Sequence, residues 1–275
     1  MKKTRLLAVL AHPDDECLGV GGTLAKYVAQ DVDVFVLTAT RGESGRYRGF
    51  RPGDPEHPGP SKLARIREGE LRAAARALGV REVTLLDYRD SQLDQARPWE
   101  AVTAIAGRIR RVRPQVVLTF GPDGAYGHPD HIAISQFTTA AIVAAADPAV
   151  TGDGENALPP YSVAKLYYIA WPESAWKGYQ AAFRKLVARV DGVERQAVPW
   201  PDWAITTEID TRDCWPTVWR AVSCHESQIR AYEQLKHLSP EDHEALWGQQ
   251  SFYRVFSTVN GGRARETDLL EGISA

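Results

Sequence analysis

The first 150 residues alternate short apolar runs with amphipathic stretches, and this order limits the chain to few folds. Apolar runs occupy residues 6–10, 32–38, 83–86 and 116–120. Helices are expected at 18–30, from Ser61 to residue 78, from Pro98 to the residue before Pro114, and from Pro129 to about residue 146. Continuous apolar runs of this length are typical of buried parallel strands. The sequence therefore predicts an α/β fold with a Rossmann-like, mostly parallel sheet and helices on both faces.

After residue 150 the regular alternation gives way to turn-rich segments, with a further strand expected at 165–170. Seven of the 8 tryptophans lie at or beyond Trp171. We expect most of them to pack in the core, and Trp171, directly after the strand, is the candidate for stacking on a ligand. We interpret residues 1–150 as the core. Residues 151–275 are interpreted as a smaller region of the same domain, which completes the sheet and walls a pocket at its edge.

Charge and composition exclude several classes of protein. The 33 basic and 35 acidic residues give a net charge of −2, so no basic footprint for nucleic acid or a membrane surface is present. The apolar run behind the N-terminus is too short for a signal sequence, and no run of about 20 apolar residues predicts a membrane span. Three cysteines without a CxxC pair favour a reducing compartment. We therefore expect a cytoplasmic protein without nucleic-acid or membrane partners; a homo-oligomer is compatible with the sequence.

Acidic and imidazole side chains follow the first expected strand, in the order Ala11-His12-Pro13-Asp14-Asp15-Glu16. Three adjacent carboxylates repel one another, and a cation would offset that repulsion. His12 and Asp15 are good ligands for a divalent metal. Because ligands of parallel α/β sheets bind beyond the carboxyl ends of the strands, this segment is a candidate metal site.

A second cluster follows the expected strand at 116–120. His128 and His131 are three residues apart at a helix start, so they share one side of its first turn. If the strands at 6–10 and 116–120 are neighbours, the two clusters together offer His, Asp and His, the three-ligand pattern of catalytic zinc sites. Asp14 is then free to take a proton from water and His128 to protonate a leaving amine. This is a complete set for metal-assisted amide hydrolysis.

The paired motifs resemble those of the PIG-L (LmbE-like) family, metal-dependent deacetylases that act on N-acetylglucosaminyl compounds. The resemblance covers most of the chain. Its motifs are AHPDDE (11–16) and GHPDH (127–131), with the flanking segments ARIREGELRAAARALGV (64–80), YRDS (88–91), PQVVLTFGPDGAYGHPDH (114–131) and ETDLLEGI (266–273).

The resemblance implies a metal centre and its base. By this similarity His12, Asp15 and His131 hold the metal, and Asp14 is the general base. Zinc is the usual metal of the family, and a site with two histidines and one aspartate also accepts ferrous iron or cobalt.

The resemblance also implies roles around the reacting amide. His128 would be the general acid or the oxyanion stabiliser, Asp130 would orient His128, and Tyr126 would reach the carbonyl oxygen. Arg67 and Asp90 match positions that bind sugar hydroxyls or a neighbouring group.

Three further features have more than one interpretation. The glycine- and proline-rich segment 41–60 carries Glu43, a candidate substrate-binding residue, among several arginines; it is either a lid over the substrate or a solvated loop. Glu16 is expected to cap a helix start. His225, in the sequence SCHESQ, is expected to have a structural or supporting role.

These observations predict a metal-dependent hydrolase that removes the N-acetyl group of an N-acetylglucosamine derivative and releases acetate. The ends of the chain are similar to relatives that make or use inositol-linked or malate-linked glucosamine thiols, which implies a low-molecular-weight thiol pathway. Two alternatives remain open. One is an amidase that cleaves a glucosaminyl amide in a thiol conjugate. The other is a sugar-binding protein that keeps the metal without turnover.

Overall fold

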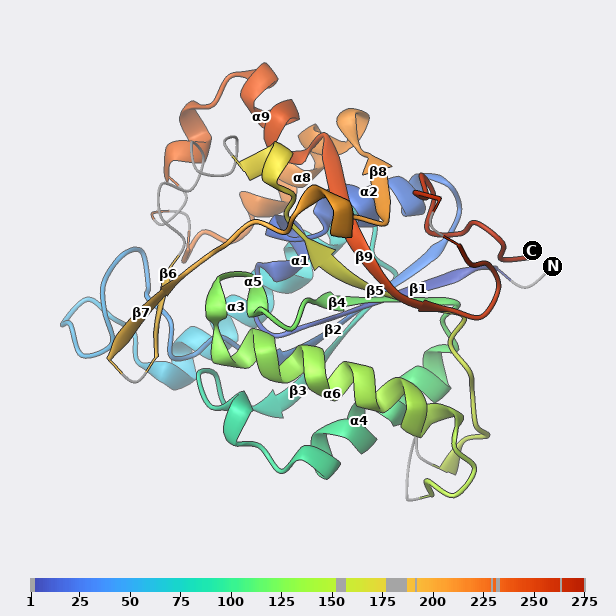
Figure 1. Cartoon of the computed structure of the whole chain (residues 1–275). Coiled ribbons are helices and arrows are strands. Elements are labelled where there is room, and N and C mark those ends of the chain that lie inside the picture. Colours follow the sequence, from blue (N-terminus) through green and yellow to red (C-terminus); the bar gives the residue numbers. More distant parts are fainter. Residues whose placement is uncertain are drawn as a thin grey trace.

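The computed structural model describes residues 3–151, 157–176, 187–190, 192–228, 230, 233–262 and 264–274. Its centre is a seven-stranded sheet in the order β3-β2-β1-β4-β5-β9-β8 (Figure 1). The strands are β1 (Arg5–Leu10), β2 (Asp33–Thr40), β3 (Glu82–Tyr88), β4 (Val116–Phe120), β5 (Lys165–Ala170), β8 (Thr207–Asp210) and β9 (Gln249–Ser257). The first five strands are parallel, whereas β9 runs antiparallel to both β5 and β8. The predicted mostly parallel α/β fold is confirmed.

Helices cover both faces of this sheet (Figure 1). Helices α4 and α6 pack together on one face, and α2, α3 and α8 pack together on the other, with α1 against α8. Their bounds are α1 (Asp15–Leu18), α2 (Gly21–Ala29), α3 (Pro60–Leu78), α4 (Pro98–Val112), α5 (Gly124–Gly127), α6 (Pro129–Ala146), α8 (Trp215–Val222) and α9 (Pro240–Trp247). A separate hairpin of β6 (Val187–Val190) and β7 (Val193–Gln196) packs against α5.

Strand β1 lies in the middle of the sheet and determines where polar side chains can meet. Its residue Leu7 pairs with Phe35 of β2 on one side and with Val117 of β4 on the other. Residues 6–10 are fully buried, as expected for a strand covered on both faces. Because β1 and β4 are parallel neighbours, the segments that follow them reach the same edge of the sheet.

Two expected helices differ in detail from the structure. The helix expected at 18–30 corresponds to α2, which begins only at Gly21; the short α1 precedes it, and Val20, with φ −138°, interrupts the helical backbone between them. Helix α3 begins at Pro60 instead of at a Ser61 cap. Proline suits the first helical position, where its missing N–H would have no helical partner.

The expectation that most tryptophans lie in the core is wrong. Of the eight tryptophans, all of them among the described residues, only Trp247 is fully buried. Trp99 and Trp203 are 61% and 85% exposed. Trp171 is half-buried directly after β5, at the carboxyl edge of the sheet.

The C-terminal segment is fastened to the sheet by one buried carboxylate. Glu266 is 1% exposed. Its carboxylate accepts hydrogen bonds from Lys165 Nζ (2.7 Å), Tyr167 OH (2.8 Å), Thr207 Oγ1 (2.8 Å) and Asn260 Nδ2 (2.7 Å). It also forms an ion pair with Arg254 Nη1 at 2.8 Å. Burial raises the pKa of Glu266, but these donors outweigh burial and lower the pKa to about 2.

We expect Glu266→Gln to lower the free energy of unfolding at pH 7 by about 3–5 kcal/mol, because the variant leaves the buried Lys165 ammonium without its carboxylate. The pKa of Glu266 is lower in the folded protein than in the unfolded chain. The contribution of the ionised Glu266 to stability is therefore complete above about pH 4.5 and is lost as the pH falls towards 2. Urea unfolding of wild type and variant between pH 7 and 2 checks this. The difference in free energy of unfolding between wild type and Glu266→Gln should shrink as the pH falls, whereas the control Glu241→Gln, at an exposed position, should match wild type throughout. A difference that stays constant with pH would contradict the ionic role of Glu266.

Among the described residues, no helix has the length and apolar character needed to cross a membrane.

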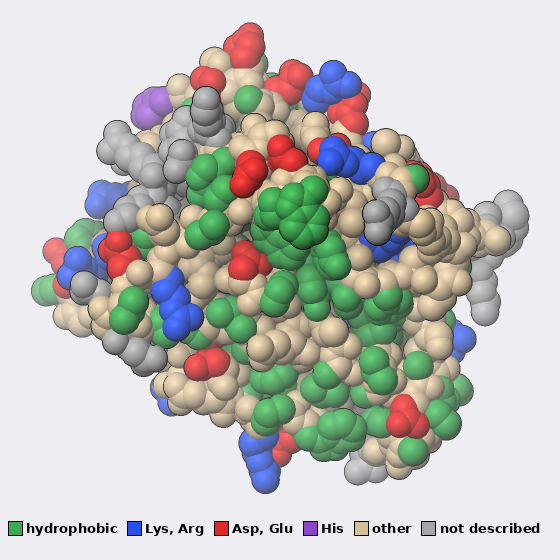
Figure 2. Space-filling model, in the orientation of Figure 1, with side chains coloured by type: hydrophobic (Ala, Val, Ile, Leu, Met, Phe, Trp, Pro, Cys, Tyr) green, Lys and Arg blue, Asp and Glu red, His purple; other side chains and the backbone are tan. Residues whose placement is uncertain are grey.

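On the face shown in Figure 2, hydrophobic side chains gather over the lower half, where α6 lies in Figure 1. Val143 of this helix is 72% exposed.

Candidate active site

The polar segments that follow β1 and β4 meet around a cavity of about 260 Å³ at the carboxyl edge of the sheet. The structure therefore brings together the two clusters that the sequence predicted to be neighbours. Residues from both clusters line the cavity, as do residues that follow β3 and β5: His12, Asp14, Asp15, Asp90, Ser91, Phe120, Tyr126, His128, His131 and Trp171.

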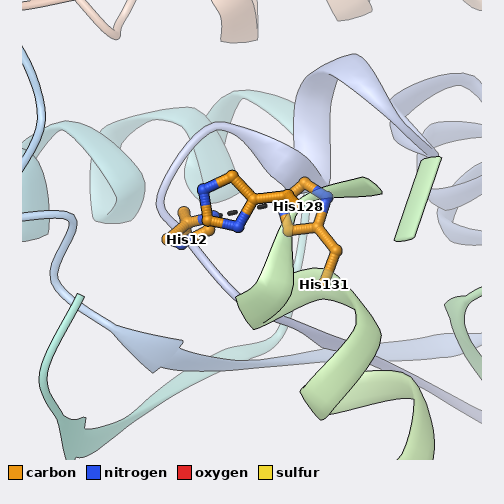
Figure 3. A group of neighbouring side chains, drawn as sticks. All are labelled: His12, His128 and His131. Atoms are coloured by element: carbon orange, nitrogen blue, oxygen red, sulfur yellow. Dashed lines mark hydrogen bonds between the residues drawn. The ribbon is translucent and has the colours of Figure 1, made fainter. Parts of the chain in front are cut away.

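Three histidines at this cavity, His12, His128 and His131, offer ligand atoms that lie within 4.8 Å of one another (Figure 3). His12 Nδ1 lies 3.1 Å from His131 Nε2. Asp15 Oδ1 lies 3.5 Å from His131 Nε2, and the other oxygen, Oδ2, lies 3.8 Å from His12 Nδ1. Two atoms bound to one tetrahedral zinc at about 2.1 Å are about 3.4 Å apart, so the distances from His131 Nε2 to His12 Nδ1 and to Asp15 Oδ1 fit a single divalent ion. His128 also lies near this group, with its ring 4.8 Å from those of His12 and His131.

Two carboxylates orient the His12 ring. His12 Nε2 is 3.1 Å from Asp130 Oδ2 and 3.2 Å from Asp90 Oδ1, so Nε2 carries a proton that it donates to them. This tautomer directs the Nδ1 lone pair at His131 and Asp15, as in carboxylate–histidine–metal arrangements. Asp130 also accepts the backbone N–H groups of Ser91 and of Leu93. The Asp130 carboxylate thus contacts His12 instead of the expected His128, because Asp130 lies at the start of α6, after β4, and β4 is the neighbour of β1.

The protonation of the three candidate ligands reflects their burial. Burial lowers the pKa of His12, but Asp130 and Asp90 outweigh burial and hold this pKa well above its usual range. Burial raises the pKa of Asp15 to about 7, and burial together with the charge of His12 lowers the pKa of His131. A metal ion must therefore displace a proton in order to bind, which is the usual coupling at such sites.

Asp14 points into the cavity from a strained backbone. Its φ of 106° is unusual for a residue other than glycine. Arg67 Nη2 lies 3.1 Å from Asp14 Oδ2, and Arg67 Nη1 donates to the carbonyl of Gly42 at 2.9 Å. Residue 42 must be glycine for this, since its φ is +65° and a Cβ there would lie 2.1 Å from Arg67 Nη1. Arg67 therefore holds Asp14, and it also lines the cavity, where the sequence predicts a contact with substrate.

A buried pair behind Asp14 was not recognised from the sequence. Glu16 Oε2 accepts the backbone N–H of Asp14 at 2.9 Å, and Glu16 Oε1 lies 2.8 Å from His225 Nε2. Both side chains are at most 1% exposed. The charge of His225 outweighs burial and lowers the pKa of Glu16, so the pair is ionic. Glu16 therefore supports Asp14 and is not a simple helix cap. The signal was present in the SCHESQ sequence, but the pairing joins residues more than 200 positions apart.

We expect Glu16→Ala to lower kcat about a hundredfold, because an error of about 1 Å in the placement of Asp14 is costly. Bound metal per chain and KM should stay within about twofold of wild type, a split that general destabilisation would not give. Glu16→Gln keeps an oxygen for the Asp14 N–H and should lose less. Glu70→Gln is the control, since the Glu70 carboxylate accepts the backbone N–H and the hydroxyl of Ser227, two residues beyond His225. A kcat of Glu16→Ala equal to that of wild type would contradict this role.

His128 is arranged as a hydrogen-bond donor. Its Nδ1 accepts the backbone N–H of Asp130 at 3.2 Å, which leaves the proton on Nε2. Burial and the charge of His12 lower the pKa of His128 to about 4. A neutral ring with Nε2–H suits an oxyanion donor better than a general acid. Tyr126 lies beside it, with ring centroids 5.8 Å apart, and burial raises the pKa of Tyr126, so its phenol keeps its proton.

The segment 41–60 is fastened over one side of the cavity. Ser44 N–H donates to Asp90 Oδ2 at 2.9 Å, and Glu43 Oε1 accepts the backbone N–H of Asp90 at 3.0 Å. Gln228 Nε2 donates to the carbonyl of Arg46 at 2.8 Å. Glu43, a predicted substrate-binding residue, is not among the described residues that line the cavity; it supports Asp90, which does line it.

Together, a Rossmann-like sheet and a buried His-Asp-His group beside a carboxylate define the class of metal-dependent hydrolases. Residues 7–142 match the model of the PIG-L family, described as GlcNAc-PI de-N-acetylase. The chain belongs to the PIG-L family.

Relatives of known name agree with this class. The chain is 36% identical to a 1D-myo-inositol 2-acetamido-2-deoxy-alpha-D-glucopyranoside deacetylase of Kineococcus radiotolerans, over 98% of this chain and 83% of that protein. It is 35% identical to a protein of the same name from Thermobispora bispora, over 99% of this chain and all of the relative. Both relatives are named as deacetylases of an N-acetylglucosamine derivative.

Solved structures share the fold. A conserved protein of Thermus thermophilus covers 94% of this chain and 98% of its own, with 25% identity and a TM-score of 0.63. An N,N'-diacetylchitobiose deacetylase of Pyrococcus horikoshii covers 92% and 84%, with 21% identity and a TM-score of 0.67. A 4-carboxy-2-hydroxymuconate hydratase of Pseudomonas putida covers 95% and 100%, with 20% identity and a TM-score of 0.67. Because a hydratase shares this fold, the reaction has to be argued from the site.

Proposed function

We propose that the protein is a zinc-dependent deacetylase that hydrolyses the N-acetyl group of a glucosamine linked to inositol. The observation that carries this proposal is the convergence of His12 Nδ1, His131 Nε2 and the Asp15 carboxylate, with Asp14 beside them in the same cavity. The names of the relatives support inositol-linked N-acetylglucosamine as the substrate.

In this proposal His12, Asp15 and His131 would hold the metal. When bound, the ion would supply a lowered pKa of the attacking water and polarisation of the acetyl carbonyl. Two nitrogen ligands and one carboxylate suit zinc, and also accept ferrous iron or cobalt.

Asp14 takes a proton from the water as its oxygen bonds to the acetyl carbon. Arg67 and Glu16 keep the Asp14 carboxylate at the reacting centre. His128 Nε2–H and the Tyr126 hydroxyl donate to the carbonyl oxygen as it becomes negative, which contributes about 2.7–4 kcal/mol per donor in comparable sites. The C–N bond then breaks, the proton held by Asp14 passes to the amine, and acetate and the free amino sugar leave.

The substrate experiment separates this proposal from both alternatives. Metal-loaded protein is incubated with free N-acetylglucosamine, its inositol and malate conjugates, and a thiol conjugate, and free amine is measured. We expect the highest kcat/KM with the inositol conjugate, at least tenfold above free N-acetylglucosamine. Amine release from the thiol conjugate alone would instead indicate an amidase. Binding of metal and sugar without any amine release would indicate a sugar-binding protein.

A further inference from the structure

Gln228 lines the cavity that holds the candidate metal ligands, and none of the roles described above uses its side-chain oxygen. It belongs to the segment that follows α8 and contains His225, and it is half-buried. An amide side chain has one oxygen that accepts hydrogen bonds and one nitrogen that donates two. Which of these atoms is available to a ligand therefore decides what Gln228 can bind.

Contacts within the protein fix the orientation of this amide. Gln228 Nε2 donates to the backbone carbonyl of Arg46 at 2.8 Å and to Ser227 Oγ at 3.0 Å. A carbonyl can only accept, so the opposite orientation of the amide would place two oxygens against each other. Both amide protons are thus used. Among the described residues no group donates to Gln228 Oε1, so this oxygen is left as an acceptor for a ligand.

Gln228 and Asp90 form one wall of the cavity, on either side of Gly45. Ser44 N–H donates to Asp90 Oδ2 at 2.9 Å, whereas the Arg46 carbonyl accepts from Gln228. The two residues that flank Gly45 therefore hold Asp90 and Gln228, and Gly45, Asp90 and Gln228 all line the cavity. This wall presents the oxygens of a carboxylate and of an amide, which are acceptors suited to the hydroxyl groups of a sugar.

We propose that Gln228 binds the substrate and selects it by one hydroxyl. Its Oε1 accepts a hydrogen bond from a hydroxyl of the glucosamine unit that carries the scissile amide. The inference rests on the proposed deacetylase function. The amide carbonyl has to reach His12, Asp15 and His131, so the sugar attached to the amide occupies the cavity that Gln228 also lines.

The hydroxyl matters because the acceptor cannot adapt. To offer an N–H group instead of its oxygen, Gln228 would have to give up both of its hydrogen bonds to Arg46 and Ser227. A substrate without the hydroxyl therefore leaves Gln228 Oε1 without a donor in a place from which the bound sugar excludes water. A site of this kind rejects an analogue that lacks the hydroxyl, because a polar group of the protein is left unpaired.

The test measures amine release from inositol-linked N-acetylglucosamine and from analogues that each lack a different hydroxyl of the glucosamine unit. Wild type should cleave one of these deoxy analogues with a kcat/KM about tenfold below that of the full substrate. Gln228→Met has a side chain of similar length without an amide. It should lower kcat/KM for the full substrate about tenfold, and its kcat/KM values for that analogue and for the full substrate should lie within about twofold of each other.

Two comparisons make this readout specific. Any discrimination that wild type shows against the other deoxy analogues should persist in Gln228→Met, because those hydroxyls do not meet Gln228. The control is Gln30→Met, at an exposed glutamine directly after α2, which should discriminate among the substrates as wild type does.

Two results would refute this role of Gln228 while the deacetylase function stands. One is a wild type that cleaves every deoxy analogue as well as the full substrate, a result that does not depend on the folding of any variant. The other is a Gln228→Met protein that keeps the wild-type discrimination against every analogue, which would show that Gln228 only fastens the segment 41–60. If metal-loaded wild type does not cleave even the full substrate, the deacetylase function itself fails, and the role of Gln228 with it.

Discussion

An Asp14→Asn variant is expected to bind its metal like the wild type and to hydrolyse the amide about a thousandfold more slowly. Asparagine keeps an oxygen for the contact with Arg67 and tolerates the positive φ of this position. It cannot take a proton from water. The loss should therefore appear in kcat, with KM and the metal content per chain nearly unchanged.

The control for this variant is Asp31→Asn. Asp31 also has a positive φ, of 62°, and pairs with Lys3 at the surface. Asp31→Asn tests whether replacing an aspartate at a positive-φ position lowers activity by itself. We expect its activity to equal that of wild type. Turnover by Asp14→Asn within tenfold of wild type would show that another group takes the proton.

Removal of the metal is expected to lower activity at least as much as Asp14→Asn does. A chelator, or the substitution His131→Gln, should lower activity a thousandfold or more, because both the activated water and the polarised carbonyl depend on the ion. Added divalent metal should restore the chelated wild type and not the variant. Because the pKa of His12 is raised, protons compete with the metal, and metal content should fall as the pH is lowered from 8 to 5.

The control is His237→Gln, which replaces an exposed histidine distant in sequence from both motifs. Its metal content, measured by atomic emission after gel filtration, should equal that of wild type. A His131→Gln variant that retains one metal per chain and full activity would remove His131 from the ligand set.

The sequence predicted the sheet and the meeting of the two motifs for one physical reason. Parallel strands place their carboxyl ends together, so the segments after β1 and β4 had to converge if these strands were neighbours, as they are. The family model and the names of the relatives agree with the predicted deacetylation of an N-acetylglucosamine derivative.

Contacts between distant segments were less accessible to sequence reasoning. The type of a side chain does not show which backbone group or charge it will meet after folding. Glu43 was therefore expected at the substrate, whereas it holds Asp90, and the contact of Arg67 with Asp14 was not foreseen, although Arg67 does line the cavity. Similarly, the Asp130 carboxylate in α6 contacts His12, which follows β1 and precedes Asp130 by 118 positions.

The most direct test of the central claim is the stoichiometry of one reaction. Metal-loaded wild type is incubated with inositol-linked N-acetylglucosamine in heavy-oxygen water, and acetate and free amine are both quantified. The account predicts equal amounts of the two products and one heavy oxygen in each acetate. It also predicts that Asp14→Asn releases both products about a thousandfold more slowly than wild type. Stoichiometric metal binding with no release of acetate by the wild type would contradict it.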